Sequence, residues 1–176
     1  QDAWTWEHQA LLRSRAVAGD SGMKAGFEQL RVKALTTYVR RENLAKEVAD
    51  MRQRMRDELS KGTPGLLDVK QDPGGITDIE FLVQYLVLRE AGRYPDLVPW
   101  SDTIRQLEAL AAHGILAPAD AEELAEAYRT YRQRMHHLNL AGAPGLVPRA
   151  EAAALVATVV RHWRAVFYTD IPQPAE

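Results

Sequence analysis

Apolar residues recur at intervals of three and four along most of the chain, which is the spacing of one face of an α-helix. The clearest example is the segment 76–89. Its apolar face consists of Ile79, Leu82, Val83, Leu86 and Val87. Phe81 and Leu88 lie on the opposite side, among polar residues, so other parts of the protein are expected to contact this helix on most of its circumference. We therefore predict a central helix around which the rest of the chain packs.

Six further segments have helical spacing. They cover approximately residues 2–18, 23–37, 42–60, 101–113, 118–140 and 149–168. One stretch differs, because residues 66–70 have the short apolar run of a β-strand. About seven helices with short connectors, and at most one extended segment, predict an all-α fold that forms a single helical domain over residues 1–176. The proline-rich tail 171–176 is expected to be disordered.

The start of the central helix carries two sequence signals. Thr77 followed by Glu80 has the form of a capping box, in which each side chain accepts a hydrogen bond from the other residue's backbone N–H. Ile76 and Phe81 take the positions of a hydrophobic staple around that cap. Both signals predict that Thr77 is the N-cap of this helix. Ser101 is the expected N-cap of the helix that follows it.

Composition and charge exclude several classes of function. Lysine and arginine number 22 against 24 aspartates and glutamates, so the net charge of −2 gives no reason to expect binding to nucleic acid or to an anionic membrane. The absence of cysteine excludes disulfides and cysteine-based zinc sites, which is compatible with the cytoplasm. No apolar run reaches the length of a membrane span. Since the chain opens without methionine, inside an aromatic segment, we expect a piece of a longer cytoplasmic protein.

Three segments resemble one enzyme family. Residues 74–86 read Gly-Gly-Ile-Thr-Asp-Ile-Glu-Phe-Leu-Val-Gln-Tyr-Leu and resemble the Gly-Gly-Ile-x-Asp-Ile-Glu-Phe-x-x-Gln signature of glutamine synthetase adenylyltransferases. Residues 3–15 are similar to the Trp-Glu-x-Gln-Ala-Leu segment that leaves the nucleotidyltransferase domain in that family, and residues 100–108 fit it as well. These segments occur in the family's order and cover residues 3 to about 140.

The resemblance implies both a fold and an activity. The chain would be the helical domain, an up-and-down bundle with a four-helix core, that follows the C-terminal nucleotidyltransferase domain of a bifunctional enzyme. Such an enzyme adds AMP from ATP to a tyrosine of glutamine synthetase and removes it again. ATP and magnesium are therefore the expected cofactors of the full-length protein, with none expected in this segment. The expected partners are glutamine synthetase, a PII signalling protein and the chain's own nucleotidyltransferase domain.

Two alternatives to this interpretation remain open. The related PII uridylyltransferases carry a looser version of the signature, so the chain could be their helical domain. It could also be a module without chemistry that binds a PII protein through its helix faces.

Eleven residues of the matching segments are candidates for contacts with a partner. Those in or after the signature are Gly74, Gly75, Asp78, Glu80, Gln84 and Arg89. Those at the hinge to the nucleotidyltransferase domain are Trp6, Glu7, Gln9, Arg13 and Arg15. Capping explains Glu80 locally, and Asp78 is either a partner of the helix dipole or a neighbour of the active site. Arg13 and Arg15 suit phosphate contacts and surface ion pairs equally.

The remaining aromatic and imidazole side chains favour structural roles. Trp4 and Trp6 are interpreted as core or domain-junction packing rather than as stacking surfaces for a ligand. His136 and His137 are adjacent, so on a helix they point about 100° apart and do not easily chelate one ion. His8 and His162 stand alone in the sequence. No metal site is predicted.

The sequence also predicts that this chain alone does not transfer AMP. Nucleotidyl transfer needs metal ions held by carboxylates, and the Gly-Ser turn and Asp-x-Asp pair that the resemblance implies are missing here. No catalytic residue is therefore assigned. Pure chain mixed with ATP, magnesium and glutamine synthetase should give no more AMP-modified product than the mixture without chain. Steady turnover would contradict this assignment.

Overall fold

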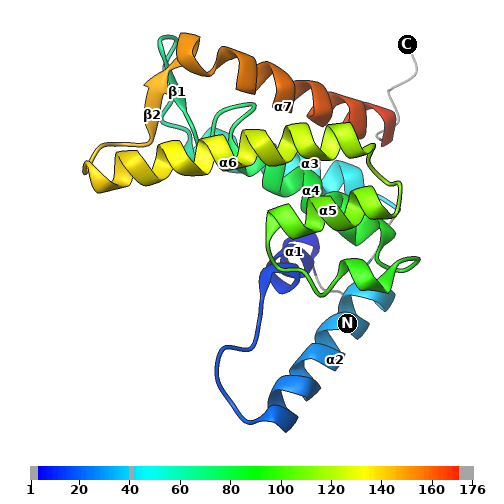
Figure 1. Cartoon of the computed structure of the whole chain (residues 1–176). Helices are drawn as coiled ribbons and strands as arrows, with labels where there is room; N and C mark the ends of the chain where they lie inside the picture. Colours follow the sequence, from blue (N-terminus) through cyan, green and yellow to red (C-terminus); the bar gives the residue numbers. More distant parts are fainter. Residues whose placement is uncertain (1–3, 40–41, 171–176) are drawn as a thin grey trace.

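The computed structural model describes residues 4–39 and 42–170, so the expected disorder of the tail 171–176 falls outside the described residues. Those residues form seven α-helices, one short 3-10 helix and two short strands (Figure 1). The helices are α1 Thr5–Arg13, α2 Ser21–Thr37, α3 Leu44–Leu59, α4 Ile76–Glu90, α5 Thr103–Ala112, α6 Pro118–Leu140 and α7 Arg149–Asp170. The strands are β1 Leu66–Asp68 and β2 Leu146–Pro148, and the 3-10 helix η1 is Pro95–Leu97. The predicted all-α class and the seven helices are confirmed.

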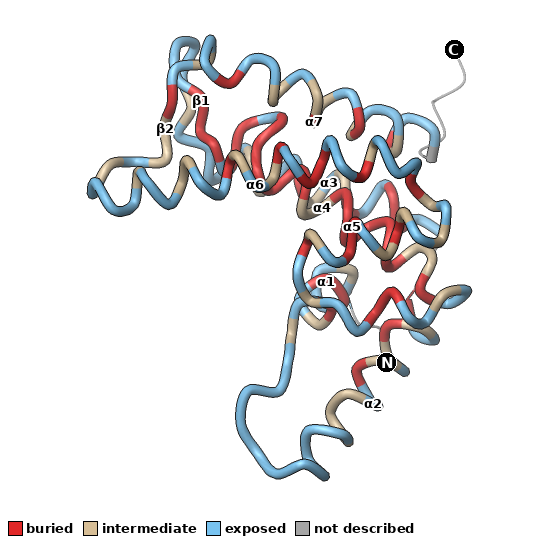
Figure 2. Tube along the Cα trace, in the orientation of Figure 1, coloured by how far each residue is buried: buried red, intermediate tan, exposed pale blue. Residues whose placement is uncertain are grey.

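Helix α4 is the centre of the fold. It packs against α1, α3, α5, α6 and α7, and eleven of its fifteen residues are buried. Ile79, Leu82 and Val83 are fully enclosed, and so is Leu88 from the opposite side of the helix. Figure 2 shows the buried positions concentrated along α4 and the faces of the helices around it. A helix with apolar residues on both sides can be stable in water only when neighbours cover it, so the sequence pattern and the packing agree.

The two strands form a small antiparallel sheet in which Leu67 is paired with Val147. The sequence predicted one extended segment near 66–70 and missed β2. A three-residue strand that ends in proline has too few positions to show an alternating pattern. The pairing joins the turn before α4 to the connection between α6 and α7. Two segments about eighty residues apart in the chain are thereby held side by side (Figure 1).

Two predicted helix starts are corrected by the structure. The N-cap of α4 is Gly75, so Thr77 lies inside the helix and its hydroxyl makes no capping hydrogen bond. The expected capping box is therefore wrong, and Asp78 instead accepts a hydrogen bond from the Gly74 N–H at 2.7 Å. The N-cap of α5 is Asp102 rather than Ser101, because the Asp102 carboxylate accepts the N–H of Arg105 at 3.0 Å.

Helix α1 is shorter than its pattern predicted. It ends at Arg13, because Ser14 takes an extended conformation and its N–H bonds the Leu11 carbonyl. Val17, which lies within the helix predicted over about residues 2–18, is 80% exposed in the connector to α2.

Helix α2 extends away from the body of the fold as an arm (Figures 1 and 2). Its attachment is the buried Arg31 guanidinium, which donates to the Leu12 carbonyl at 3.2 Å and to the Val98 carbonyl at 2.9 Å. Met23 and Leu30 are exposed on this arm. No described helix is long and apolar enough to cross a membrane.

Tyr131 of α6 offers a direct test of the core. It is fully buried, and its hydroxyl has no hydrogen-bond partner among the described residues. Tyr131→Phe should therefore leave the free energy of unfolding unchanged or raise it slightly, because an unpartnered buried hydroxyl is lost. Urea denaturation at neutral pH measures the change. A loss above about 1 kcal/mol would show that the hydroxyl has a stabilising partner.

The same variant tests how the ionisation of Tyr131 changes the free energy of unfolding with pH. Burial raises the pKa of Tyr131 from 10.0 to about 12 in the folded chain. Between these values the unfolded chain ionises this tyrosine and the folded chain does not, so stability is lost as pH rises. Between about pH 9 and pH 11, the wild-type chain should lose about 1 kcal/mol more than Tyr131→Phe. Equal losses in the two proteins would refute the shifted pKa.

Candidate functional site

The two segments that carry the main motifs meet in space. Helix α1 packs against α4, and the Arg13 guanidinium forms an ion pair with the Glu80 carboxylate at 3.1 Å. The other oxygen of Glu80 accepts a hydrogen bond from the Tyr128 hydroxyl of α6 at 3.1 Å. Burial raises the pKa of Tyr128, so this phenol stays protonated as the donor. The Glu80 carboxylate thus links α1, α4 and α6. It is not the capping carboxylate that its spacing suggested.

A groove with a volume of about 620 Å³ lies between α1, α3 and α4. Helix α1 contributes Trp6, Gln9 and Arg13, and α4 contributes Thr77, Glu80, Phe81 and Gln84. Helix α3 supplies Met51, Arg54, Met55 and Glu58. We call this feature the α1–α4 groove. Its size is that of a small-ligand or side-chain site, and its walls carry residues of both motif segments.

Two buried polar groups on the groove lack a hydrogen-bond partner among the described residues. They are the Gln9 amide nitrogen and the Thr77 hydroxyl, both on residues that are almost fully buried. An unpartnered buried donor or acceptor costs about 1–3 kcal/mol, so native proteins rarely leave one unpaired. Both groups belong to residues that line the groove. Capping had seemed to explain Thr77, and only the structure shows that its hydroxyl makes no such hydrogen bond.

Asp78 is more deeply buried than Glu80 and contacts different residues. Its carboxylate is 2% exposed and bonds the Arg52 guanidinium at 2.7 Å and that of Arg56 at 3.2 Å. Arg52 also donates to the Gln71 carbonyl at 2.8 Å. Burial lowers the pKa of Arg52, and the adjacent Asp78 opposes that shift. The carboxylate therefore anchors α3 and the turn before α4, and it does not line the α1–α4 groove.

The positions of Gly74 and Gly75 require glycine for steric reasons. Gly74 has a φ of +80°, and a Cβ there would lie 2.9 Å from the Val156 carbonyl oxygen of α7. A Cβ on Gly75 would lie 2.6 Å from the Val69 carbonyl oxygen. The sequence revealed no local need for these glycines, since the contacts involve residues brought close by the fold. Their role is close packing of the turn.

The other candidates divide between the groove and elsewhere. Trp6, Gln9, Arg13, Glu80 and Gln84 line the groove. Glu7 instead accepts the Trp4 N–H at 2.7 Å and so belongs to the start of α1. Arg89 lies at the far end of α4, paired with Glu90 at 2.8 Å, and Arg15 is exposed in the connector to α2.

The interpretation of Trp4 and Trp6 as core packing is wrong for this chain. The two side chains are 67% and 55% exposed. Packing at a domain junction, the other half of that interpretation, stays a prediction.

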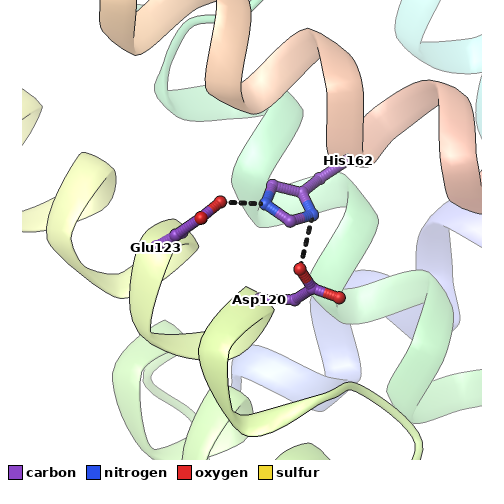
Figure 3. Close-up of side chains that lie close together, drawn as sticks. All are labelled: Asp120, Glu123 and His162. Carbon is purple, nitrogen blue, oxygen red and sulfur yellow. Dashed lines mark hydrogen bonds and ion pairs between the residues drawn. The ribbon is translucent and has the colours of Figure 1, made fainter.

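Sequence reasoning also treated His162 as isolated, and the structure corrects this. The buried ring of His162 on α7 lies between Glu123 and Asp120 of α6 (Figure 3). Its Nε2 is 2.9 Å from Glu123, and its Nδ1 is 3.9 Å from Asp120. His162 and Arg161 lower the pKa of Glu123. No local pattern could have paired residues on two helices.

This cluster fits an ion-pair link between helices better than a metal site. One ligand atom of each residue lies within 4.8 Å of the others, but the two carboxylates face different nitrogens of the ring (Figure 3). The Arg161 guanidinium also bonds the same Glu123 oxygen that faces the ring. A cation there would have to displace it.

The family of this chain follows from comparison with known proteins. The sequence model of the family described as GlnD PII-uridylyltransferase matches residues 42–145, more than half of the chain. The chain therefore belongs to this family. The matched region runs from the start of α3 to the loop after α6 and includes the whole signature helix.

Curated relatives give the more particular likeness. Three proteins named bifunctional glutamine synthetase adenylyltransferase/adenylyl-removing enzyme are similar to almost the whole chain. The protein from Hahella chejuensis is 46% identical over 95% of this chain and 18% of its own length. Those from Thioalkalivibrio sulfidiphilus and Shewanella oneidensis are 45% and 43% identical over 93% and 94% of this chain, in each case 17% of their own length. The predicted resemblance is confirmed, and the chain spans less than a fifth of these relatives.

The buried carboxylate of Asp78 generates a stability prediction. Asp78→Asn keeps the shape of the side chain but leaves two cations in the interior without their counter-charge. We expect a loss of about 3 kcal/mol in the free energy of unfolding, as for other broken buried pairs. Asp50→Asn on α3 is the control, since Asp50 forms an exposed pair with Lys46 and should change stability by less than about 0.5 kcal/mol. Urea denaturation of both variants is the measurement, and equal small effects would remove Asp78 from this structural role.

Proposed function

We propose that this chain is the helical part of an enzyme that adds AMP from ATP to glutamine synthetase and removes it. In this proposal the α1–α4 groove is the surface at which the helical part meets the nucleotidyltransferase domain of the same polypeptide. The substrate of the full-length enzyme is glutamine synthetase, and its regulator is a PII signalling protein. The names of the relatives and their much greater length support this assignment.

The observation that carries the proposal is the α1–α4 groove itself, which both motif segments build. It is lined by Gln9 and Thr77, two buried residues that each have an unpartnered polar group. Beside them Trp6 is more than half exposed. A large exposed aromatic ring next to buried polar groups without partners is typical of a surface that another protein part covers. Because α1 leads back toward the N-terminus of the chain, the expected neighbour is the nucleotidyltransferase domain that the motif resemblance implies before it.

Magnesium for the transfer step would come from that neighbouring domain. The two carboxylates nearest the strand β1 are already satisfied within this chain. Asp68 accepts the N–H groups of Lys61, Lys70 and Gln71. Asp72 pairs with Arg149 at 2.5 Å and accepts the Asp68 N–H at 3.1 Å. Neither offers free oxygens to an ion, so these two residues do not fit a metal site, and in this proposal the chain contributes by positioning the catalytic domain.

A second candidate function, binding of a PII protein without chemistry, is favoured by the arm α2. Met23 and Leu30 are exposed there, outside the residues matched by the family model. Removal of both apolar side chains would weaken PII binding in this alternative and leave the α1–α4 groove intact.

The test of the proposed function is Thr77→Val in the full-length enzyme that contains this chain. Valine has nearly the same shape as threonine and lacks the hydroxyl, so stability should stay within about 0.5 kcal/mol because no hydrogen bond within the chain is lost. Adenylylation of glutamine synthetase should fall about tenfold, the equivalent of one lost hydrogen bond of about 1.4 kcal/mol.

The matched control is Thr130→Val, a partly exposed position on α6 that does not line the groove and whose hydroxyl makes only a long contact of 3.5 Å with Glu126. It should leave both stability and rate unchanged. A normal rate of adenylylation in Thr77→Val, with the fold intact, would exclude the groove from the contact with the catalytic domain.

A further inference from the structure

Helix α2 has two faces with different surroundings. One face attaches the helix to the rest of the chain, because the buried Arg31 donates to the carbonyls of Leu12 and Val98. The other face is open at Met23 and Leu30, which are 64% and 70% exposed. In Figures 1 and 2 this helix extends from the body of the fold, and much of its length is exposed. The arm is therefore fixed on one side and uncovered on the other.

The open face carries a continuous apolar stripe. Helix positions that follow one another at intervals of four, three, four and four residues lie within about 80° around the axis. In α2 and its C-cap these positions are Met23, Phe27, Leu30, Ala34 and Tyr38. We call them the α2 stripe. A contiguous exposed apolar surface of this kind is typical of a face that packs against another protein part.

Gly26 is a second and independent indication of a neighbour. It lies in the interior of α2, where glycine is less favourable than alanine. A Cβ at this position would meet no atom within 4 Å among the described residues, so nothing in them requires glycine. Gly26 borders the α2 stripe, about 60° from Met23 around the axis. The absence of a side chain there would let the backbone of a covering part approach closely.

The charged side chains beside the α2 stripe have one sign. Lys24 and Lys33 are exposed and lie on opposite sides of it, about 100° and 80° from Met23 around the axis. The single acidic residue of α2, Glu28, is bonded by Arg31 on the attached side. Two such faces packed together would bring lysines against lysines, so a second copy of this chain does not fit. A surface that fits is apolar at its centre and acidic at its borders.

Helix α2 lies in a part of the chain that the bifunctional relatives share and the family model does not match. The model begins at residue 42, after α2. The relatives match 93–95% of the chain, too much to omit the 17 residues of α2. Directly before α2, Trp4 and Trp6 at the start of α1 are also exposed. The uncovered apolar residues at this end of the chain therefore favour a neighbour that comes before α1.

We propose that the α2 stripe is covered by the part of the same polypeptide that precedes α1, through an apolar surface with acidic borders. This rests on the proposed function in one respect, since it takes the chain to be a piece of the longer bifunctional enzyme. The contact is separate from the α1–α4 groove, because no residue of α2 lines that groove. The preceding domain would then contact the chain at two places, which fixes its orientation as well as its position.

Hydrogen exchange of the backbone amides of residues 21–30 tests the cover. In the 176-residue chain these amides should exchange rapidly, because an uncovered helix end opens easily. In the full-length enzyme, alone and dilute, they should exchange at least about tenfold more slowly. Equal rates in the two proteins would overturn the proposal.

The same measurement identifies other occupants. Slowing that appears only at high protein concentration, together with a doubled mass, would assign the stripe to a second copy. Slowing that needs an added PII protein, or vesicles of phosphatidylglycerol, would assign it to that protein or to a membrane surface. Each of these results would overturn the proposal.

Two leucines of similar exposure locate the contact. Leu30 on α2 is 70% exposed and Leu140 at the end of α6 is 76% exposed. In the full-length enzyme, Leu30→Gln should speed the exchange of residues 21–30 at least about fivefold, because the cover is weakened. Leu140→Gln should change it by less than about twofold. Equal effects of the two variants would overturn the α2 stripe as the contact.

Gly26→Ala should act in opposite directions in the two proteins. In the 176-residue chain the alanine favours the helix and meets no atom, so the exchange of residues 21–30 should slow. In the full-length enzyme the added methyl group would meet the covering surface, and the exchange should speed up at least about threefold. Slower exchange in both proteins would overturn the close approach at Gly26.

These results are separable from those of the groove. If the full-length enzyme protects residues 21–30 and Thr77→Val adenylylates at a normal rate, the α2 contact stands and the groove contact is refuted. If residues 21–30 exchange equally in both proteins and Thr77→Val lowers adenylylation, the α2 contact is refuted and the groove contact stands.

Discussion

The structure depends on one buried charge, the carboxylate of Asp78. Three donors from two elements converge on it: Arg52 and Arg56 from α3, and the Gly74 N–H from the turn before α4. A buried carboxylate is stable only when such donors surround it, so the position of α3 against the start of α4 is fixed by its need for them. Since α3 forms one wall of the α1–α4 groove, the geometry of the groove follows from an interaction that lies outside it.

The two acidic residues of the signature therefore have separate roles. Asp78 points into the protein and sets the backbone, whereas Glu80 lies at the surface of α4 and joins Arg13 to Tyr128. Two positions apart on a helix, side chains point about 200° away from each other, which is why neighbouring acids in one motif reach different surroundings. The motif thus contains one acidic residue, Asp78, that stabilises the interior and another, Glu80, that forms part of the surface of the α1–α4 groove.

The α1–α4 groove also contains polar groups that have no partner within the described residues. Gln9 and Thr77, which each have an unpartnered polar group, and the exposed Trp6 line one concave face. The rest of the described surface pairs many of its charges, including the Asp120–Glu123–His162 cluster that links α6 to α7.

The sequence by itself determined the all-α class, the seven helices, the central position of α4 and the family, because helical periodicity and motif spacing are local properties of the chain. It did not determine what each motif residue does. Glu80 bonds a tyrosine 48 positions away and Asp78 an arginine 26 positions away, and Gly74 is required by a contact with α7. Only the tertiary structure shows that Thr77 lacks the cap its spacing suggested, and that His162 lies between two carboxylates. The physical reason is the same in each case: the energy of a polar or closely packed side chain depends on its neighbours in space, and the chain order does not list them.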